Sequence, residues 1–373
     1  MKFLLVKKKR KNSLDFVLIF LLVLLILIGC VFVYSASFYS AELSYGDKFF
    51  FLKKQMMGVI IGAICFIFFY FFDYHKIEKF KWVFLVLSFV LLGLVFVPGI
   101  GITNYGATRW INLKFITLQP SEFAKFTFIV FASSSLSKRA ENIKSFKGML
   151  PVLFVGLVFC GLIIMEPNMS ITICMAMLMV VMLFIGGARF KHFALLVIPA
   201  VVAVVVLIII EPYRLRRLTA FVDPFASSKG EGFQLVQSLL GIALGGFFGT
   251  GIFHSRQKYL FLPFAESDFI FSIIAEETGF VGCVLVVTLF VLLFLRIIKI
   301  ARSAPDKFGS MLASGISSII LIQVLMNIAV VTGSIPPTGL PLPFISAGST
   351  SLVVFMSAIG VVLNINKQSK SRA

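Results

Sequence analysis

Four carboxylates stand close together in residues 255–282, where a polar, basic stretch turns into an apolar one. Glu266 and Asp268 lie at the change, and Glu276 and Glu277 follow about two turns further on. Carboxylates this close to lipid are costly, so they are usually retained for function. On a helix, Asp268 and Glu276 share one side and Glu277 points the other way. The pattern places Asp268 at a membrane surface and Glu276 about 12 Å deeper.

Asp268 has the residue type and position of a general base or of a ligand for a divalent cation such as Mg²⁺ or Mn²⁺. A plainer interpretation is helix capping by Ser267 or Asp268, because a carboxylate is favourable at the positive end of a helix. Both interpretations stay open from the sequence. For Glu276 and Glu277, a structural role with hydrogen bonds inside a helix bundle is the favoured interpretation.

The elements that position these residues are membrane helices. The chain has 373 residues, of which 59% are hydrophobic and only 13% are charged, and its mean hydropathy is +1.04. A soluble domain cannot bury that much apolar surface, so the composition predicts an all-α polytopic membrane protein. The net charge of +18 does not indicate nucleic-acid binding, because the sequence has no soluble domain with a basic face. It fits lysines and arginines that set membrane orientation.

Ten apolar segments are long enough to cross a bilayer. We therefore expect a basic tail at 1–14, one transmembrane domain at 15–366 and a second tail at 367–373. The expected spans are 15–37, 55–72, 80–98, 121–137, 148–165, 168–187, 191–210, 268–295, 308–332 and 347–365.

The loops on the side of the N-terminus carry about twice as many lysines and arginines as the opposite loops. The positive-inside rule then places both termini in the cytoplasm. The long loops, at about 99–120, 211–267 and 333–346, all face outward, and long loops in compact proteins are usually functional. The chemistry is therefore expected at the outer face.

Basic residues in these outer loops oppose the positive-inside rule, so an anionic ligand such as a lipid phosphate or pyrophosphate fits them. Arg109 has the geometry of a bidentate phosphate clamp, although Arg109 and its neighbour Trp110 also suit a plain membrane-interface anchor. The glycine-rich run at 241–251 suits a phosphate cradle or, as we prefer, close helix packing. The further basic candidates are Arg214, Arg216, Arg217, Arg256 and Lys258.

The motifs accumulate into a resemblance that covers nearly the whole chain. The sequence resembles the SEDS proteins of bacterial cell-wall synthesis, the FtsW/RodA/SpoVE group, and its FLKKQ, SRQK and short C-terminal tail look most like the division branch, FtsW. The matching motifs are VYSAS near residue 34, FLKKQ at 51–55, ATRWI at 107–111, LQPSEFAK at 118–125, EPN at 166–168, YRLRRLTAFVDPF at 213–225, GFQLVQSL at 232–239, GGFFGTG at 245–251, SRQKYLFLP at 255–263, SDFIFSIIAEETGFVG at 267–282 and PPTGLPLPFIS at 336–346.

The resemblance implies an inverting peptidoglycan glycosyltransferase in the bacterial cytoplasmic membrane, at the division septum. Such enzymes polymerise lipid II into undecaprenyl-linked glycan and release undecaprenyl pyrophosphate. They act with a class B penicillin-binding protein, a transpeptidase, and with other division proteins. A lipid II flippase, an elongation-type polymerase like RodA and a non-enzymatic scaffold are the alternatives. A flippase needs a polar path through the membrane, for which Lys125, Glu276 and Glu277 are the candidates.

The resemblance also implies which residues form the site. Asp268 matches the catalytic aspartate of the family, with a bound divalent cation as an alternative role. Departures from the family pattern at Thr117, Asn168, Phe264, Glu266 and Ala347 put details of substrate contact in question. The residues expected to bind substrate are Arg109, Trp110, Gln119, Glu122, Lys125, Arg214, Arg217, Gln234, Gln237, Ser238, Arg256, Lys258 and Glu276.

Overall fold

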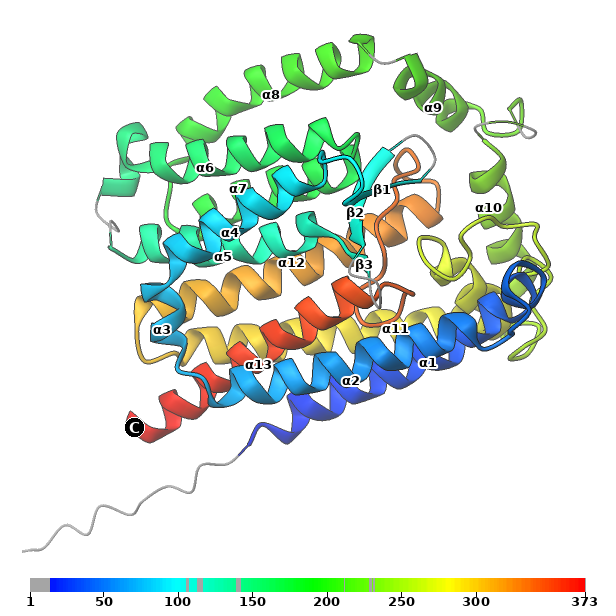
Figure 1. The fold of residues 1–373 in the computed structure, drawn as a ribbon, viewed down its shortest axis with the longest axis horizontal. Coiled ribbons are helices and arrows are strands. Elements are labelled where there is room, and N and C mark those ends of the chain that lie inside the picture. Colours follow the sequence, from blue (N-terminus) through cyan, green and yellow to red (C-terminus); the bar gives the residue numbers. More distant parts are fainter. Residues whose placement is uncertain are drawn as a thin grey trace, which may run out of the picture.

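A helical bundle forms most of the molecule, and each of the ten expected spans overlaps one of its helices (Figure 1). These helices are α1 (Phe16–Tyr45), α2 (Phe50–Phe71), α4 (Lys81–Leu94), α5 (Pro120–Lys138), α6 (Phe146–Met165), α7 (Met169–Ile185), α8 (Phe190–Ile210), α11 (Ile270–Arg302), α12 (Lys307–Val331) and α13 (Ser349–Arg372). The computed structural model describes residues 14–104, 107–112, 117–138, 142–210, 212–227, 230 and 232–372. Within these residues, α1, α2, α6, α11, α12 and α13 are long and apolar enough to cross a membrane by length and composition alone.

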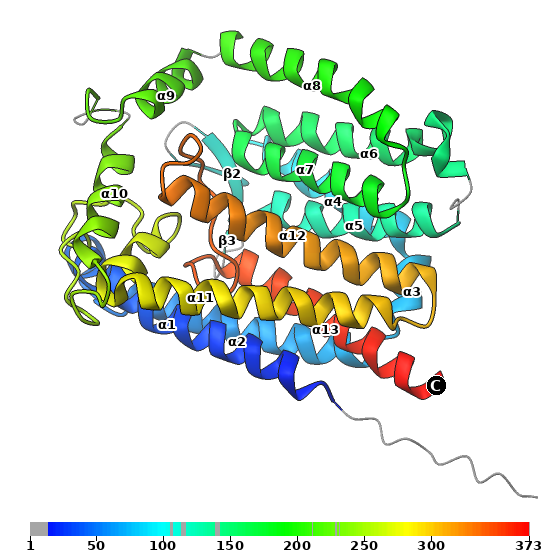
Figure 2. The same cartoon turned by 180° about the vertical axis from the view of Figure 1, so that it is seen from behind.

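Helix α12 lies at the centre of the bundle, where it packs against α5, α7, α10, α11 and α13. Small residues allow this close packing. At Gly315, a Cβ atom would lie only 2.6 Å from the side chain of Ile129 on α5. Figure 2 shows α11 and α12 side by side across the bundle, while α8 runs along its edge. Helix α8 exposes Val197, Ile198 and Val201, as expected for a lipid-facing surface.

Both described ends of the chain lie at one end of the bundle, where α1 begins and α13 ends (Figure 1). Asp15 accepts a hydrogen bond from the main-chain N–H of Leu18 and thereby caps α1. Its carboxylate also pairs with Arg296 near the end of α11, at 2.8 Å. The residues expected as a C-terminal tail continue α13 as far as Arg372.

The opposite end of the bundle holds the long connections, which contain regular structure that the sequence analysis did not predict (Figure 1). The first of them forms an antiparallel sheet in the order β1-β2-β3, in which Trp110 pairs with Ile102 and Ile111 pairs with Leu118. The elements in these connections are β1 (Gly101–Asn104), β2 (Ala107–Asn112), β3 (Thr117–Leu118), α9 (Pro212–Val222) and α10 (Phe233–Gly245). Two further short elements, α3 (Tyr74–Lys79) and a 3-10 helix (Asn142–Lys144), belong to the connections between α2 and α4 and between α5 and α6.

Helix α11 is broken at Gly279, whose φ of 66° and ψ of −162° are not helical. The main chain of the glycine-rich run at 241–251 forms hydrogen bonds with the helix at this break. Phe280 and Val281 donate their N–H groups to the carbonyls of Gly246 and Phe247, at 3.0 and 3.2 Å. This pairing satisfies backbone groups that the break would otherwise leave unpaired inside a membrane. The short first part of α11 therefore has its own fixed place, with Asp268 just ahead of it.

Candidate functional site

Asp268 lies in irregular chain two residues before α11 begins at Ile270. The N-cap residue of α11 is Phe269, and no side chain in the described structure caps its first turn. The structure therefore excludes the capping interpretation for both Ser267 and Asp268. Since Asp268 is partly exposed just ahead of α11, its carboxylate remains a candidate for chemistry.

The surroundings of Asp268 make its carboxyl group a weaker acid than an ordinary aspartate. Burial raises the pKa of Asp268 to about 7, and the neighbouring charge of Glu266 adds to the rise. Arg109 and Arg217 oppose this rise because their positive charges favour the carboxylate. Burial also raises the pKa of Glu266. Asp268 and its neighbour Glu266 thus share one electrostatic site with two arginines from distant parts of the sequence.

The last outer connection, residues 332–348, holds the chain beside Asp268. The N–H of Ala347 donates to the carbonyl of Glu266 over 2.9 Å. The hydroxyl of Ser346 donates to the carbonyl of Ser267 over 2.5 Å. This proline-rich segment therefore packs against protein, as expected for irregular backbone at membrane depth.

Arg109 projects from β2 toward the connection between α6 and α7. Its Nε donates to the carbonyl of Glu166 over 3.4 Å, and a second guanidinium nitrogen donates to the carbonyl of Pro167. Trp110 is half-buried and, as the next residue on the strand, faces the other side of the sheet. Arg109 is thus held on the protein side of β2, within electrostatic reach of Asp268.

Glu166 is a buried acid next to Arg109 that is not among the site residues expected from the sequence. Its side chain is fully buried, and neither carboxyl oxygen has a hydrogen-bond partner among the described residues. Burial raises the pKa of Glu166 to about 8, while Arg109 opposes the rise. The sequence signal for Glu166 is its place in the EPN motif at 166–168. Asn168 caps α7, accepting from the N–H of Ile171.

Helix α9 lies at the same end of the molecule as the sheet (Figure 1). Arg216 and Arg217 are exposed, and Arg217 is close enough to influence Asp268. The side chain of Arg214 lies outside the described residues. Arg256 is exposed, and its main-chain N–H donates to Glu276 over 2.7 Å.

Glu276 and Glu277 lie in a buried network around the glycine-rich segment and the SRQK motif. Glu276 accepts from the Ser255 hydroxyl as well as from the Arg256 N–H. Glu277 accepts from Ser35 on α1 at 2.6 Å and pairs with Lys258 at 3.2 Å. These contacts agree with the structural interpretation of the two acids. They also give Lys258, predicted to bind substrate, a partner inside the protein.

A second buried network contains Glu122 and Lys125 on α5. The Lys125 ammonium donates to Glu122 at 2.7 Å and to Gln323 on α12 at 2.8 Å, and both members of the ion pair have no exposed side-chain surface. Gln323 in turn donates to the carbonyl of Pro341 in the last outer connection. The half-buried Gln119 donates its N–H to Thr350. Glu122 and Lys125, both expected to bind substrate, are therefore buried and paired with each other, and Gln323 links them to the last outer connection.

The polar residues of α10 that were expected to bind substrate differ in their exposure. Gln234 and Gln237 are partly exposed. Ser238 is buried, with its hydroxyl 2.6 Å from that of Ser272 and 2.7 Å from the carbonyl of Val331. Ser238 therefore ties α10 to α11 and α12.

The glycines of the glycine-rich run allow close backbone approach. A Cβ at Gly245 would lie 2.0 Å from the carbonyl oxygen of Ala275, and one at Gly249 would lie 2.2 Å from that of Glu277. The N–H groups of Thr250 and Gly251 donate to the carbonyls of Glu276 and Glu277. Those N–H groups are already engaged, so this geometry supports close packing and leaves them unable to cradle a phosphate.

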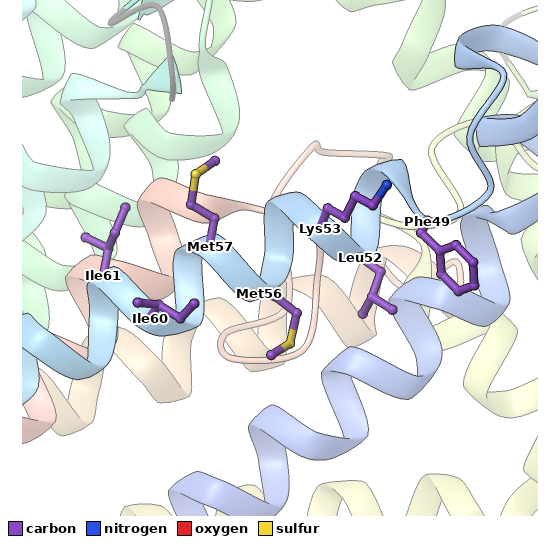
Figure 3. Close-up of a pocket in the computed structure, with 7 residues that line it drawn as sticks. All are labelled: Phe49, Leu52, Lys53, Met56, Met57, Ile60 and Ile61. Atoms are coloured by element: carbon purple, nitrogen blue, oxygen red, sulfur yellow. The ribbon is translucent and has the colours of Figure 1, made fainter.

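An apolar groove of about 450 Å³ runs along α2, and none of these acids lines it (Figure 3). Its one charged lining residue is Lys53, which pairs with Asp47 at 2.7 Å. The lining contains no carboxylate, so it offers no acidic side chain like Asp268. The residues that line it are Phe49, Leu52, Lys53, Met56, Met57, Ile60 and Ile61.

Fold and site together define a polytopic α-helical membrane protein with an acidic group and arginines gathered at one end. Residues 15–371 match the model of the FtsW/RodA/SpoVE family, described as cell cycle proteins. The chain belongs to this family.

Among its relatives, stage V sporulation protein E of Bacillus subtilis is 41% identical over 364 residues, which are 97% of this chain and 99% of that protein. A probable peptidoglycan glycosyltransferase FtsW of a Geobacter species is 38% identical over 366 residues, 98% of this chain and 100% of that protein.

Solved structures are similar over the same extent. A chain in the structure of a peptidoglycan synthase complex that coordinates polymerization and crosslinking has a TM-score of 0.79 at 28% identity, covering 96% of this chain and 98% of that one. The rod shape-determining protein RodA of Thermus thermophilus has a TM-score of 0.70 at 25% identity, covering 95% of this chain and 97% of that one.

Proposed function

We propose that this protein is a peptidoglycan glycosyltransferase that polymerises lipid II at the outer face of the cytoplasmic membrane during cell division and releases undecaprenyl pyrophosphate. The single observation that carries the proposal is the partly exposed Asp268, whose pKa is raised to about 7 beside Arg109 and Arg217. Membership of the family and the FtsW relatives support the same activity.

The proposed chemistry needs a base and a positive site. Asp268 accepts the proton of the acceptor sugar hydroxyl as that oxygen bonds to the anomeric carbon of the donor. The bond from that carbon to the pyrophosphate oxygen breaks on the opposite side, which inverts the anomeric configuration. A base with a pKa near the working pH is well matched to this proton transfer. Arg109 and Arg217 stabilise the negative charge that develops on the leaving pyrophosphate.

A divalent cation is compatible with these residues. Mg²⁺ in proteins is typically held by one or two carboxylates together with substrate phosphates. Asp268 and Glu266 would supply the carboxylates, and the pyrophosphate would supply the remaining oxygens. Mg²⁺ or Mn²⁺ bound there would neutralise charge on the leaving group. In that arrangement Asp268 holds the cation rather than the proton.

The proposed setting is the bacterial division septum, with both termini in the cytoplasm. The support is the excess of lysine and arginine in the loops on the side of the N-terminus. The proposed partner is a class B penicillin-binding protein, together with other division proteins. The similarity to a chain in a synthase complex that coordinates polymerization and crosslinking supports such a partnership.

The main alternative is transport of lipid II across the membrane. The candidates for a polar path were Lys125, Glu276 and Glu277. All three are buried and bonded to other protein groups, Lys125 with Glu122 and the two glutamates with Ser255 and its neighbours. Charges engaged in this way favour a structural task over a transport path.

The test is glycan synthesis from lipid II by purified protein in detergent, with and without its transpeptidase partner. A polymerase makes glycan chains without a sealed membrane and loses this activity in Asp268→Ala. A flippase acts only in sealed vesicles and tolerates Asp268→Ala. Glycan that forms equally with wild type and Asp268→Ala would contradict the proposed function and indicate a contaminating polymerase.

A further inference from the structure

The chain around Asp268 lacks regular secondary structure of its own to fix the carboxylate. Residues 266–268 are irregular, and the helix that follows begins without a side-chain cap. A catalytic group must nevertheless stay within a fraction of an ångström of its working position. Contacts from elsewhere in the fold must therefore supply the restraint.

One restraint comes from Asn327 on the central helix α12. Its Nδ2 donates to the main-chain carbonyl of Asp268 over 2.8 Å and to that of Leu340 over 2.8 Å. Both hydrogens of the amide are thereby used. Asn327 is only 1% exposed, so water does not replace these bonds easily. The residue links the chain at Asp268 to the last outer connection through one buried nitrogen.

A second restraint comes from Gly339 in that connection. A Cβ atom at this position would lie 2.8 Å from Oδ2 of Asp268 and 3.7 Å from its Cγ, and it would meet no other atom within 4 Å among the described residues beyond its chain neighbours. The φ of Gly339 lies outside the left-handed region, so its backbone accepts an L side chain. The N–H of Gly339 donates to Ser170 on α7 over 3.1 Å, which fixes its place. The missing side chain thus leaves the space in which the Asp268 carboxylate lies.

We propose that Asn327 and Gly339 are positioning residues for Asp268. Asn327 holds the main chain of Asp268, and the bare backbone of Gly339 forms the wall against which its carboxylate rests. This assignment depends on the catalytic role proposed for Asp268. It predicts that turnover is sensitive to these two residues while substrate binding is not.

Gly339→Ala is the sharpest test, because Asp268 is the one residue that the added methyl group meets in the described part of the chain, apart from its chain neighbours. We expect kcat for glycan synthesis at saturating lipid II to fall about 10²-fold, as for a displaced catalytic group. The KM for lipid II and the melting temperature should stay close to wild type. The matched control is Gly348→Ala, since a Cβ there meets only the Cβ of Ser351 at an ordinary 3.7 Å. The control should keep the wild-type kcat.

Asn327→Asp provides a second test that keeps the shape of the side chain. The carboxylate cannot donate to the two carbonyls, so we expect kcat to fall with KM unchanged. If Gly339→Ala has a lowered melting temperature, Asn327→Asp decides the proposal. Wild-type kcat in either folded variant would overturn it, and so would a loss expressed only in KM.

Asp268→Asn in the same assay separates the proposed catalytic role of Asp268 from the positioning role of Asn327 and Gly339. If Asp268→Asn is fully active, the proposed role of Asp268 fails, and the positioning role fails with it. If Asp268→Asn is inactive while Gly339→Ala and Asn327→Asp turn over normally, only the positioning role fails.

Discussion

The ammonium of Lys258 lies 3.2 Å from Oε1 of Glu277, and neither side chain has any exposed surface. Glu277 stands two residues before the break in α11 at Gly279. Lys258 also donates to the carbonyl of Phe253, so the pair ties the chain that follows the glycine-rich run to the broken helix. The short first part of α11, just behind Asp268, is therefore anchored from within the protein.

Lys258→Met should destabilise the protein strongly, because it leaves the carboxylate of Glu277 buried without its cation. Breaking such a buried pair costs about 3–5 kcal/mol. We expect a clear fall in the melting temperature of the detergent-purified protein. The double variant Lys258→Met/Glu277→Gln should recover much of the loss, because the uncompensated charge is gone. A single variant that melts like wild type would show that the pair contributes nothing to stability.

Substitutions at Asp268 should abolish turnover without unfolding the protein. Since Asp268 does not cap α11, neither Asp268→Asn nor Asp268→Ala removes a helix cap. We expect both to lose at least ~10²-fold in glycan synthesis, the usual size of a proton-transfer contribution. Asp268→Glu should retain little activity because its carboxylate is displaced by a methylene. Each variant is assayed with lipid II and the transpeptidase partner, alongside a melting curve. Wild-type activity in Asp268→Asn would make Glu266 the next candidate.

The pH dependence of activity should report the raised pKa of Asp268. A general base works in its deprotonated form, so activity rises with pH as the carboxyl group ionises around pH 7. At pH 6, kcat/KM should be about tenfold below its plateau. Glu266→Gln removes a neighbouring negative charge that raises this pKa, so its profile should shift to lower pH. A wild-type profile that stays flat down to pH 5 would contradict this assignment.

Arg109 should be needed for activity through the shape of its guanidinium as well as its charge. Arg109→Ala should lose most glycan synthesis while the protein stays folded and bound to its partner. Arg109→Lys should also be poor, because a point charge replaces a planar fork that forms paired hydrogen bonds. Full activity in Arg109→Lys would mean that charge alone matters. Full activity in Arg109→Ala would remove Arg109 from the site.

The proposed orientation is tested by single cysteines in a cysteine-free background. Cysteines at Thr103 and Ser334 should react with an impermeant thiol reagent in intact spheroplasts. Cysteines at Ser145 and Ser303 should react only after lysis. These positions lie at opposite ends of the bundle, as the helix order requires. Labelling of Ser145→Cys before lysis would place the Asp268 end in the cytoplasm.

The sequence by itself predicted the spanning helices, because continuous apolar runs leave a membrane chain no alternative to hydrogen-bonded helix. It also singled out Asp268, Arg109 and Arg217 as candidate site residues, since charges at a membrane boundary are costly and therefore conspicuous. It predicted close packing for the glycine-rich run. It missed the sheet at 101–118 and helices α9 and α10, whose short or amphipathic patterns lack a long apolar run.

Only the tertiary structure decided which of the polar residues meet. Arg109, Arg217 and Asp268 lie far apart in the sequence and share one electrostatic site. Lys258, in contrast, is only ten residues before Asp268 in the sequence, but it pairs with Glu277. Hydrophobic periodicity determines that a segment is a helix, but side-chain pairing across helices depends on distances that no local pattern encodes. The positions of Asn327 and Gly339 beside Asp268 follow from the same cause, because both belong to elements that reach the site only when the bundle closes.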